Sequence, residues 1–120
     1  MVARHVLALD FWPALANRFI RSHWAERERT LRRDAEALAL YAFSQGVPKA
    51  SGKRRVSLTV LYSRPQNRPD PDAMLKCLLD CLVRAGLLVD DNPDRLELGP
   101  VAYERAPRKG LRILLEDLDA

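Results

Sequence analysis

The sequence predicts an α+β domain in which two helices cover a mixed four-stranded sheet, with the elements in the order β-α-β-α-β-β. Residues 56–62, VSLTVLY, alternate apolar and polar side chains, which is the period of a half-buried strand. Residues 25–43 instead carry apolar side chains at helical spacing. A second helix is expected over residues 71–85, because proline suits its first position and the following Gly86 suits its end. The chain length fits one domain spanning residues 1–120.

The first strand is expected over residues 4–11, RHVLALDF. Both of its faces are fairly apolar, which favours a central position in the sheet. Pro13 ends this strand, and residues 13–24 are expected to form a loop that leads into the first helix. At the end of this loop, Trp24 is predicted to be a packing anchor.

The first helix has one apolar stripe, made of Leu31, Ala35, Leu38 and Ala42. On its surface, Glu28 and Arg32 are four residues apart and are expected to form an ion pair. A basic loop is expected over residues 44–55, before the alternating strand.

The last two strands are expected over residues 95–105 and 111–117, joined by a turn with the sequence APRKG. The apolar phase of residues 95–105 shifts at Gly99-Pro100. Such a shift predicts a β-bulge at that point.

Charge is unevenly distributed along this chain of net charge +4. Residues 1–68 hold 13 Lys/Arg against 5 Asp/Glu, whereas residues 69–120 hold 7 against 11. This pattern suits a protein that binds phosphates with its basic half and coordinates a metal ion with carboxylates of its acidic half. The sequence shows no signal peptide and no membrane-spanning stretch, so we expect a cytoplasmic, soluble protein.

The two cysteines, Cys77 and Cys81, lie four residues apart on the second predicted helix and therefore share a face. With two histidines and no further cysteine elsewhere, the sequence offers no zinc framework. We expect both thiols to be buried as small apolar groups in a reducing compartment.

Four carboxylates surround the second predicted helix. Asp70 is expected at its N-cap and Asp72 in its first turn, while Asp90 and Asp91 follow a segment, GLLV, that we expect to return to the helix start. Clustered carboxylates repel one another, and a divalent cation removes that repulsion. An all-carboxylate set favours Mg²⁺ or Mn²⁺. Lys76, one turn after Asp72, is placed to pair with an acid or to reach a substrate phosphate.

The same residues also have an ordinary structural interpretation. Asp-Pro is a common helix cap, and DDNPD is an ordinary turn composition. Asp80 is four residues after Lys76 and is expected to be its ion-pair partner. A structural protein with capped helices, which predicts no metal affinity, therefore remains an alternative at this point.

The stretch DPDAMLKCLLDCLVRAGLLVDD resembles the signature of the RusA family of Holliday-junction resolvases. The matching residues are Asp70, Asp72, Lys76, Asp80, Leu82, Gly86, Asp90 and Asp91. Upstream, Asn17, His23 and Trp24 are similar to a Pro-x-x-x-Asn stretch that many members follow with His-Trp. The closing PRKGLRILLED resembles the last hairpin of the family. One departure is that Ala73 stands where the family has asparagine.

This resemblance implies a homodimeric, Mg²⁺-dependent endodeoxyribonuclease that binds four-way DNA junctions and nicks two strands symmetrically in recombination and repair. It implies that the catalytic residues are Asp70, Asp72, Asp91 and Lys76. The metal ligands would be Asp70, Asp72 and Asp91, with Asp90 as a fourth, and Mn²⁺ is an alternative ion. Lys76 would contact a phosphate or stabilise the transition state. The protein would come from a bacterium or a phage and be associated with the nucleoid.

Further candidate DNA contacts lie in the predicted loops and helices. The candidate phosphate contacts that flank the acids are Arg18, Arg21, Arg64 and Arg68. The complete predicted DNA-binding set is Asn17, Arg18, His23, Arg64, Arg68 and Lys76. Two other functions remain open. One is a nuclease for flaps, forks or RNA, and the other is a catalytically weakened nucleic-acid-binding protein in which Ala73 reflects lost activity.

Overall fold

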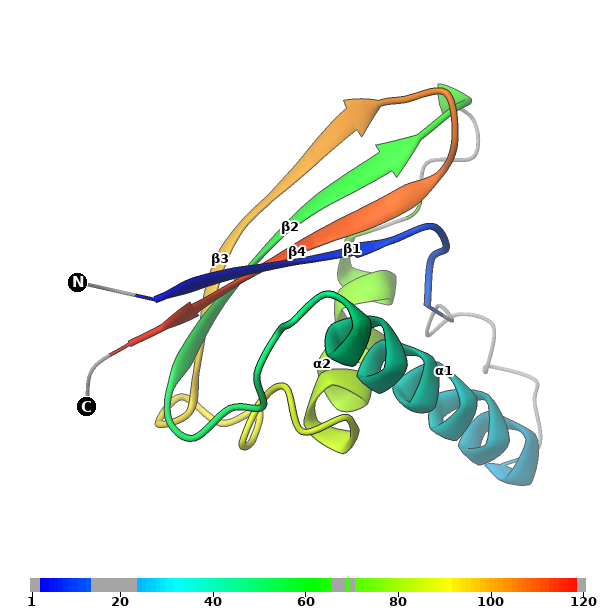
Figure 1. Ribbon diagram of the computed structural model, residues 1–120. Coiled ribbons are helices and arrows are strands. Elements are labelled where there is room, and N and C mark those ends of the chain that lie inside the picture. The colour runs from blue at the N-terminus through cyan, green and yellow to red at the C-terminus, as the bar shows by residue number, and fades with distance from the viewer. Residues whose placement is uncertain (1–2, 14–23, 66–68, 70, 119–120) are drawn as a thin grey trace.

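The computed structural model describes residues 3–13, 24–65, 69 and 71–118 and has the predicted α+β class and element order (Figure 1). The elements are β1 (Arg4–Leu9), α1 (Trp24–Ser44), β2 (Arg54–Tyr62), α2 (Pro71–Arg84), β3 (Leu96–Arg105) and β4 (Gly110–Asp117). Within the described residues, no helix combines the length and the apolar character that crossing a membrane requires.

The four strands form one mixed sheet in the order β1-β4-β2-β3. β2 and β3 run parallel, whereas β4 pairs antiparallel with both β1 and β2. In the described sheet β1 is an edge strand, so the expected central position is wrong. Its two apolar faces have different environments, because Leu7 is fully buried while Val6 is 55% exposed. The apolar residues on the outer face of β1 therefore do not mean that a strand lies on each side of it.

One hydrophobic core joins the sheet to both helices, which lie on the same side of it (Figure 1). The predicted stripe of α1 is buried in this core, and so are the side chains of α2 that face it: Met74, Cys77, Leu78, Cys81 and Leu82. α2 is followed by a left-handed Gly86, with φ of 79°. The amide of Leu87 then donates to the carbonyl of Leu82 at 2.9 Å, as in a glycine-terminated helix.

The predicted bulge at Gly99-Pro100 is confirmed by the pairing of β2 with β3. Val56 is opposite Leu98, but Leu58 is opposite Val101, so β3 contains one extra residue between these two pairs. A β-carbon on Gly99 would lie 2.1 Å from the hydroxyl oxygen of Ser57. The next nearest atoms would be at 3.2 Å, so a larger residue at this position of the bulge requires the Ser57 hydroxyl to move.

Two predictions about α1 are wrong. Glu28 accepts both of its hydrogen bonds from Arg84 of α2, at 2.6 and 3.0 Å, instead of pairing with Arg32. The packing of α2 against α1 supplies this partner, which spacing along one helix does not reveal. Trp24, expected to be a packing anchor, is 72% exposed because it is the first residue of α1, and that end of the helix extends beyond the sheet (Figure 1).

Both cysteines are buried free thiols, so their expected burial is confirmed. Burial, followed by the negative charge of Asp34, raises the pKa of Cys81 to about 12. Burial and the charge of Asp80 also raise the pKa of Cys77. Because the thiolate is the reactive form, these groups are inert in the folded protein.

We therefore expect Cys81 of the native protein to react very slowly with a thiol-specific reagent at pH 8, where about 10⁻⁴ of a thiol with a pKa of about 12 is ionised. Cys77 should also react slowly, because it is buried and its pKa is raised. In denaturant both thiols should react within the mixing time of the same assay. Rapid reaction of Cys81 in the native protein would contradict the burial of this face of α2.

Candidate functional site

The start of α2 carries the described part of the predicted acid site. Pro71 is the first residue of the helix, and Asp72 lies in the first turn. Asp72 and Lys76 are exposed on one flank of the helix, whereas Met74 and Leu78 on the opposite flank are fully buried. The burial of one flank thus fixes the direction in which the acid and the lysine point.

The charges further along this flank of α2 are already paired. Asp80 lies 3.3 Å from the guanidinium of Arg84, which also binds Glu28 of α1. Asp80 is therefore not the partner of Lys76, and this prediction is wrong. Lys76 forms no ion pair within the part of the chain that the structure describes, so its charge is not neutralised there.

The segment that leads into α2 is fixed against β3. The hydroxyl of Tyr103 donates to the carbonyl of Pro69 at 2.9 Å, and the Tyr103 ring contacts that of Tyr62 edge to face at 6.5 Å. Pro69 itself is buried. These contacts hold the start of α2 close to the ends of β2 and β3.

The second pair of predicted acids lies in the segment between α2 and β3. The carboxylate of Asp90 accepts from the amide of Asp91 at 2.8 Å and from the side chain of Asn92 at 3.0 Å. The oxygen of the Asn92 side chain accepts from the amide of Asp94 at 3.0 Å. Asp90 and Asn92 thus stabilise a turn by local hydrogen bonds, while the carboxylate of Asp91 is exposed.

The structure does not bring Asp72 and Asp91 together. Asp72 lies in the first turn of α2, whereas Asp91 lies in the segment beyond the last residue of this helix. The 14 residues of α2 span roughly 20 Å at 1.5 Å per residue. Figure 1 shows the segment with Asp90 and Asp91 (yellow) leaving the end of α2 that is far from its first turn. The expected return to the helix start does not occur, because Leu87 and Leu88 enter the core and direct the chain toward the start of β3.

No group of three or more acidic, histidine or cysteine side chains that could hold a metal ion occurs among the described residues. Asp70 lies outside these residues, as do five of the candidate DNA contacts: Asn17, Arg18, Arg21, His23 and Arg68. Arg64 is described and exposed just after β2. The described residues of one chain therefore do not complete a metal site, and the predicted set of ligands stays a prediction.

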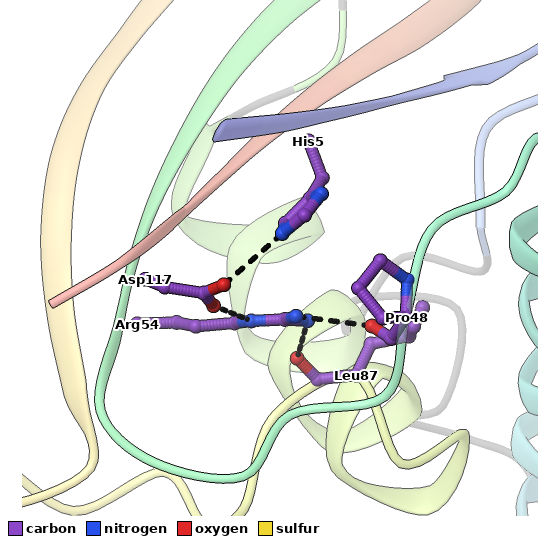
Figure 2. A network of polar contacts seen from close by, with 5 residues as sticks. All are labelled: His5, Pro48, Arg54, Leu87 and Asp117. Atoms are coloured by element: carbon purple, nitrogen blue, oxygen red, sulfur yellow. Dashed lines mark hydrogen bonds and ion pairs between the residues drawn. The ribbon is translucent and has the colours of Figure 1, made fainter. Parts of the chain in front are cut away.

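The position of the acidic segment depends on Arg54, which the sequence analysis placed in a basic loop. Its side chain is 1% exposed. As Figure 2 shows, the guanidinium donates to the carboxylate of Asp117 at 2.6 Å and to the carbonyls of Leu87 and Pro48, both at 3.0 Å. The amide of Arg54 also donates to the carbonyl of Arg95 at 3.1 Å. One residue thus holds both ends of the segment that carries Asp90 and Asp91.

Asp117 is the charged partner that makes the burial of Arg54 possible. Burial acts to raise the pKa of Asp117, but hydrogen bonds from Arg54 and His5 outweigh it and hold the pKa below its usual value. His5 lies 3.1 Å from the same carboxylate. Arg54 could have been found from the sequence, since it is in phase with the buried positions Val56 and Leu58.

No family model matches this chain, and a comparison with curated proteins finds no match. The resemblance to the RusA family therefore stays a prediction, supported by the residues of the chain itself.

Proposed function

We propose that this protein is a Mg²⁺-dependent endodeoxyribonuclease that acts as a homodimer in the cytoplasm and resolves four-way DNA junctions by paired, symmetric nicks. The observation that carries the proposal is the exposed flank at the start of α2. There Asp72 lies one turn from Lys76, which forms no ion pair with a described residue. An acid and an uncompensated cation side by side suit a site that must handle both a metal ion and a phosphate.

Phosphodiester hydrolysis explains why such a flank would be useful. In metal-dependent nucleases a divalent cation activates water and offsets the negative charge that develops on the phosphate. Lys76 would bind a non-bridging phosphate oxygen and stabilise the negative charge that develops on the phosphate in the transition state. The resemblance of residues 70–91 to the RusA signature gives this chemistry its proposed substrate, branched DNA.

The direct test is incubation of the purified protein with a synthetic mobile four-way junction, with and without Mg²⁺. We expect paired nicks at symmetric positions, ends that a ligase can seal, and no product in EDTA. Flap, fork and linear duplex substrates of the same sequence serve as controls. Equal or faster cleavage of these controls would indicate a nuclease of another specificity, and binding without cleavage in either Mg²⁺ or Mn²⁺ would indicate a non-enzymatic DNA-binding protein.

A further inference from the structure

A group of exposed cations gathers where β2 and β3 end and β4 begins. Arg105 is the last residue of β3, and Arg108 and Lys109 lie in the turn to β4. Arg64 follows β2 by two residues, and Tyr62 at the end of β2 pairs with Arg105. None of these cations forms an ion pair with an acid in the described part of the chain.

This lack of pairing sets Arg105 apart from the other arginines of the strands. Arg4 pairs with Glu116, Arg54 with Asp117, Arg55 with Glu97, and Arg112 with Glu104. Each of those charges is offset within the sheet. The positive charge of the β3–β4 turn is not offset in this way, and a cluster of like charges raises the local concentration of an anionic partner.

The surrounding residues hold the turn in place. The indole nitrogen of Trp12 donates to the carbonyl of Leu61 at 3.2 Å and to that of Gly110 at 2.9 Å, which ties the end of β2 to the start of β4. The ammonium nitrogen of Lys109 lies 5.5 Å from the centre of the Trp12 ring. Trp12 therefore holds together the strand ends that flank the turn and contacts one of the cations of the turn, Lys109.

The turn is also linked to the start of α2. Tyr103 binds the carbonyl of Pro69, and Arg105 is two residues further along β3. Alternate residues of a strand lie on the same face, about 7 Å apart. Arg105 therefore extends from the face that holds the start of α2, beyond Tyr103. A strand of DNA lying across Asp72 and Lys76 could continue along this face to the turn.

We infer that Arg105, Arg108 and Lys109 of the β3–β4 turn bind the phosphodiester backbone of the DNA substrate, outside the site at the start of α2. The inference rests on the proposed function for the nature of the substrate. Contacts of this kind fix the position of DNA on the protein without reading its sequence. The acidic second half of the chain thus contributes a basic surface of its own.

The test compares two double variants that each remove two exposed arginines. Arg105→Gln with Arg108→Gln alters the turn, and Arg29→Gln with Arg32→Gln alters exposed positions of α1. Figure 1 shows the turn at the top of the molecule and α1 at its lower right, so the two sites are well separated. Affinity for a four-way junction is measured by fluorescence anisotropy in EDTA over a range of salt concentrations.

Each phosphate contact contributes about 0.9 to the slope of log affinity against log salt, so the turn variant should lower that slope by about 1.8. Its affinity at ~0.1 M salt should fall about tenfold or more. The α1 variant should keep the wild-type slope. Equal effects of the two variants, or an unchanged slope in the turn variant, would overturn the inference.

Cleavage assays of the same proteins separate this inference from the proposed function. If the wild type cuts junctions and the two double variants bind alike, the proposed function stands and the inference fails. If the wild type binds DNA through the turn but cuts no substrate, the binding surface stands and the proposed nuclease activity fails.

Discussion

Replacing Asp72 by asparagine is expected to abolish Mg²⁺-dependent cleavage of a four-way junction while leaving junction affinity unchanged or higher. The substitution keeps the shape of the side chain and removes one negative charge at the exposed start of α2. A metal ion supplies several kcal/mol of transition-state stabilisation, so losing a ligand should cost about 100-fold or more in rate. Affinity should not fall, because less negative charge then faces the DNA phosphates.

Two further variants sharpen this result. Lys76→Met should also slow cleavage, with a modest loss of affinity, since one phosphate contact among many is removed. Asp94→Asn removes an exposed carboxylate from the segment between α2 and β3 and should leave both properties unchanged. If Asp72→Asn instead weakened binding and spared cleavage, Asp72 would only stabilise the first turn of α2. The nuclease centre would then lie elsewhere.

Replacing Arg54 by methionine is expected to produce a large loss of stability. Removing one partner of a buried ion pair costs about 3–5 kcal/mol. We expect the lower end of that range, because 42% of the Asp117 side chain remains exposed and water can reach its carboxylate. The carbonyls of Leu87 and Pro48 would also lose their donors. Urea unfolding should show a lower midpoint with an unchanged slope.

The neighbouring arginine provides a matched control for this measurement. Arg55 is also in β2 and pairs with Glu97, but 41% of its side chain is exposed. It also lies 3.8 Å from the carboxylate of Glu116, which would keep Arg4 as a partner at 3.2 Å. Arg55→Met should lower the urea midpoint much less than Arg54→Met, because an exposed ion pair contributes little to stability. Similar losses in the two variants would show that the buried network of Arg54 does not hold the α2–β3 segment in place.

Local sequence patterns determined most of the fold. Alternation over residues 56–62 and helical spacing over residues 25–43 specify which face of each element is buried, and burial of that face is what drives the chain to fold. The phase shift at Gly99-Pro100 likewise revealed the bulge, because one inserted residue moves every later side chain to the opposite face. These features depend on near neighbours in the chain and can be read without knowing the fold.

The sequence also singled out Asp72 and Lys76, whose four-residue spacing alone places them on one flank of a helix. Only the tertiary structure decided the partners of charged side chains. Glu28 and Asp80 both form ion pairs with Arg84, and Arg54 is buried against Asp117, 63 residues away in the chain. The tertiary structure also placed Asp72 in the first turn of α2 and Asp91 beyond the opposite end of that helix. Such outcomes depend on how whole elements pack, and spacing along the chain carries no information about that packing.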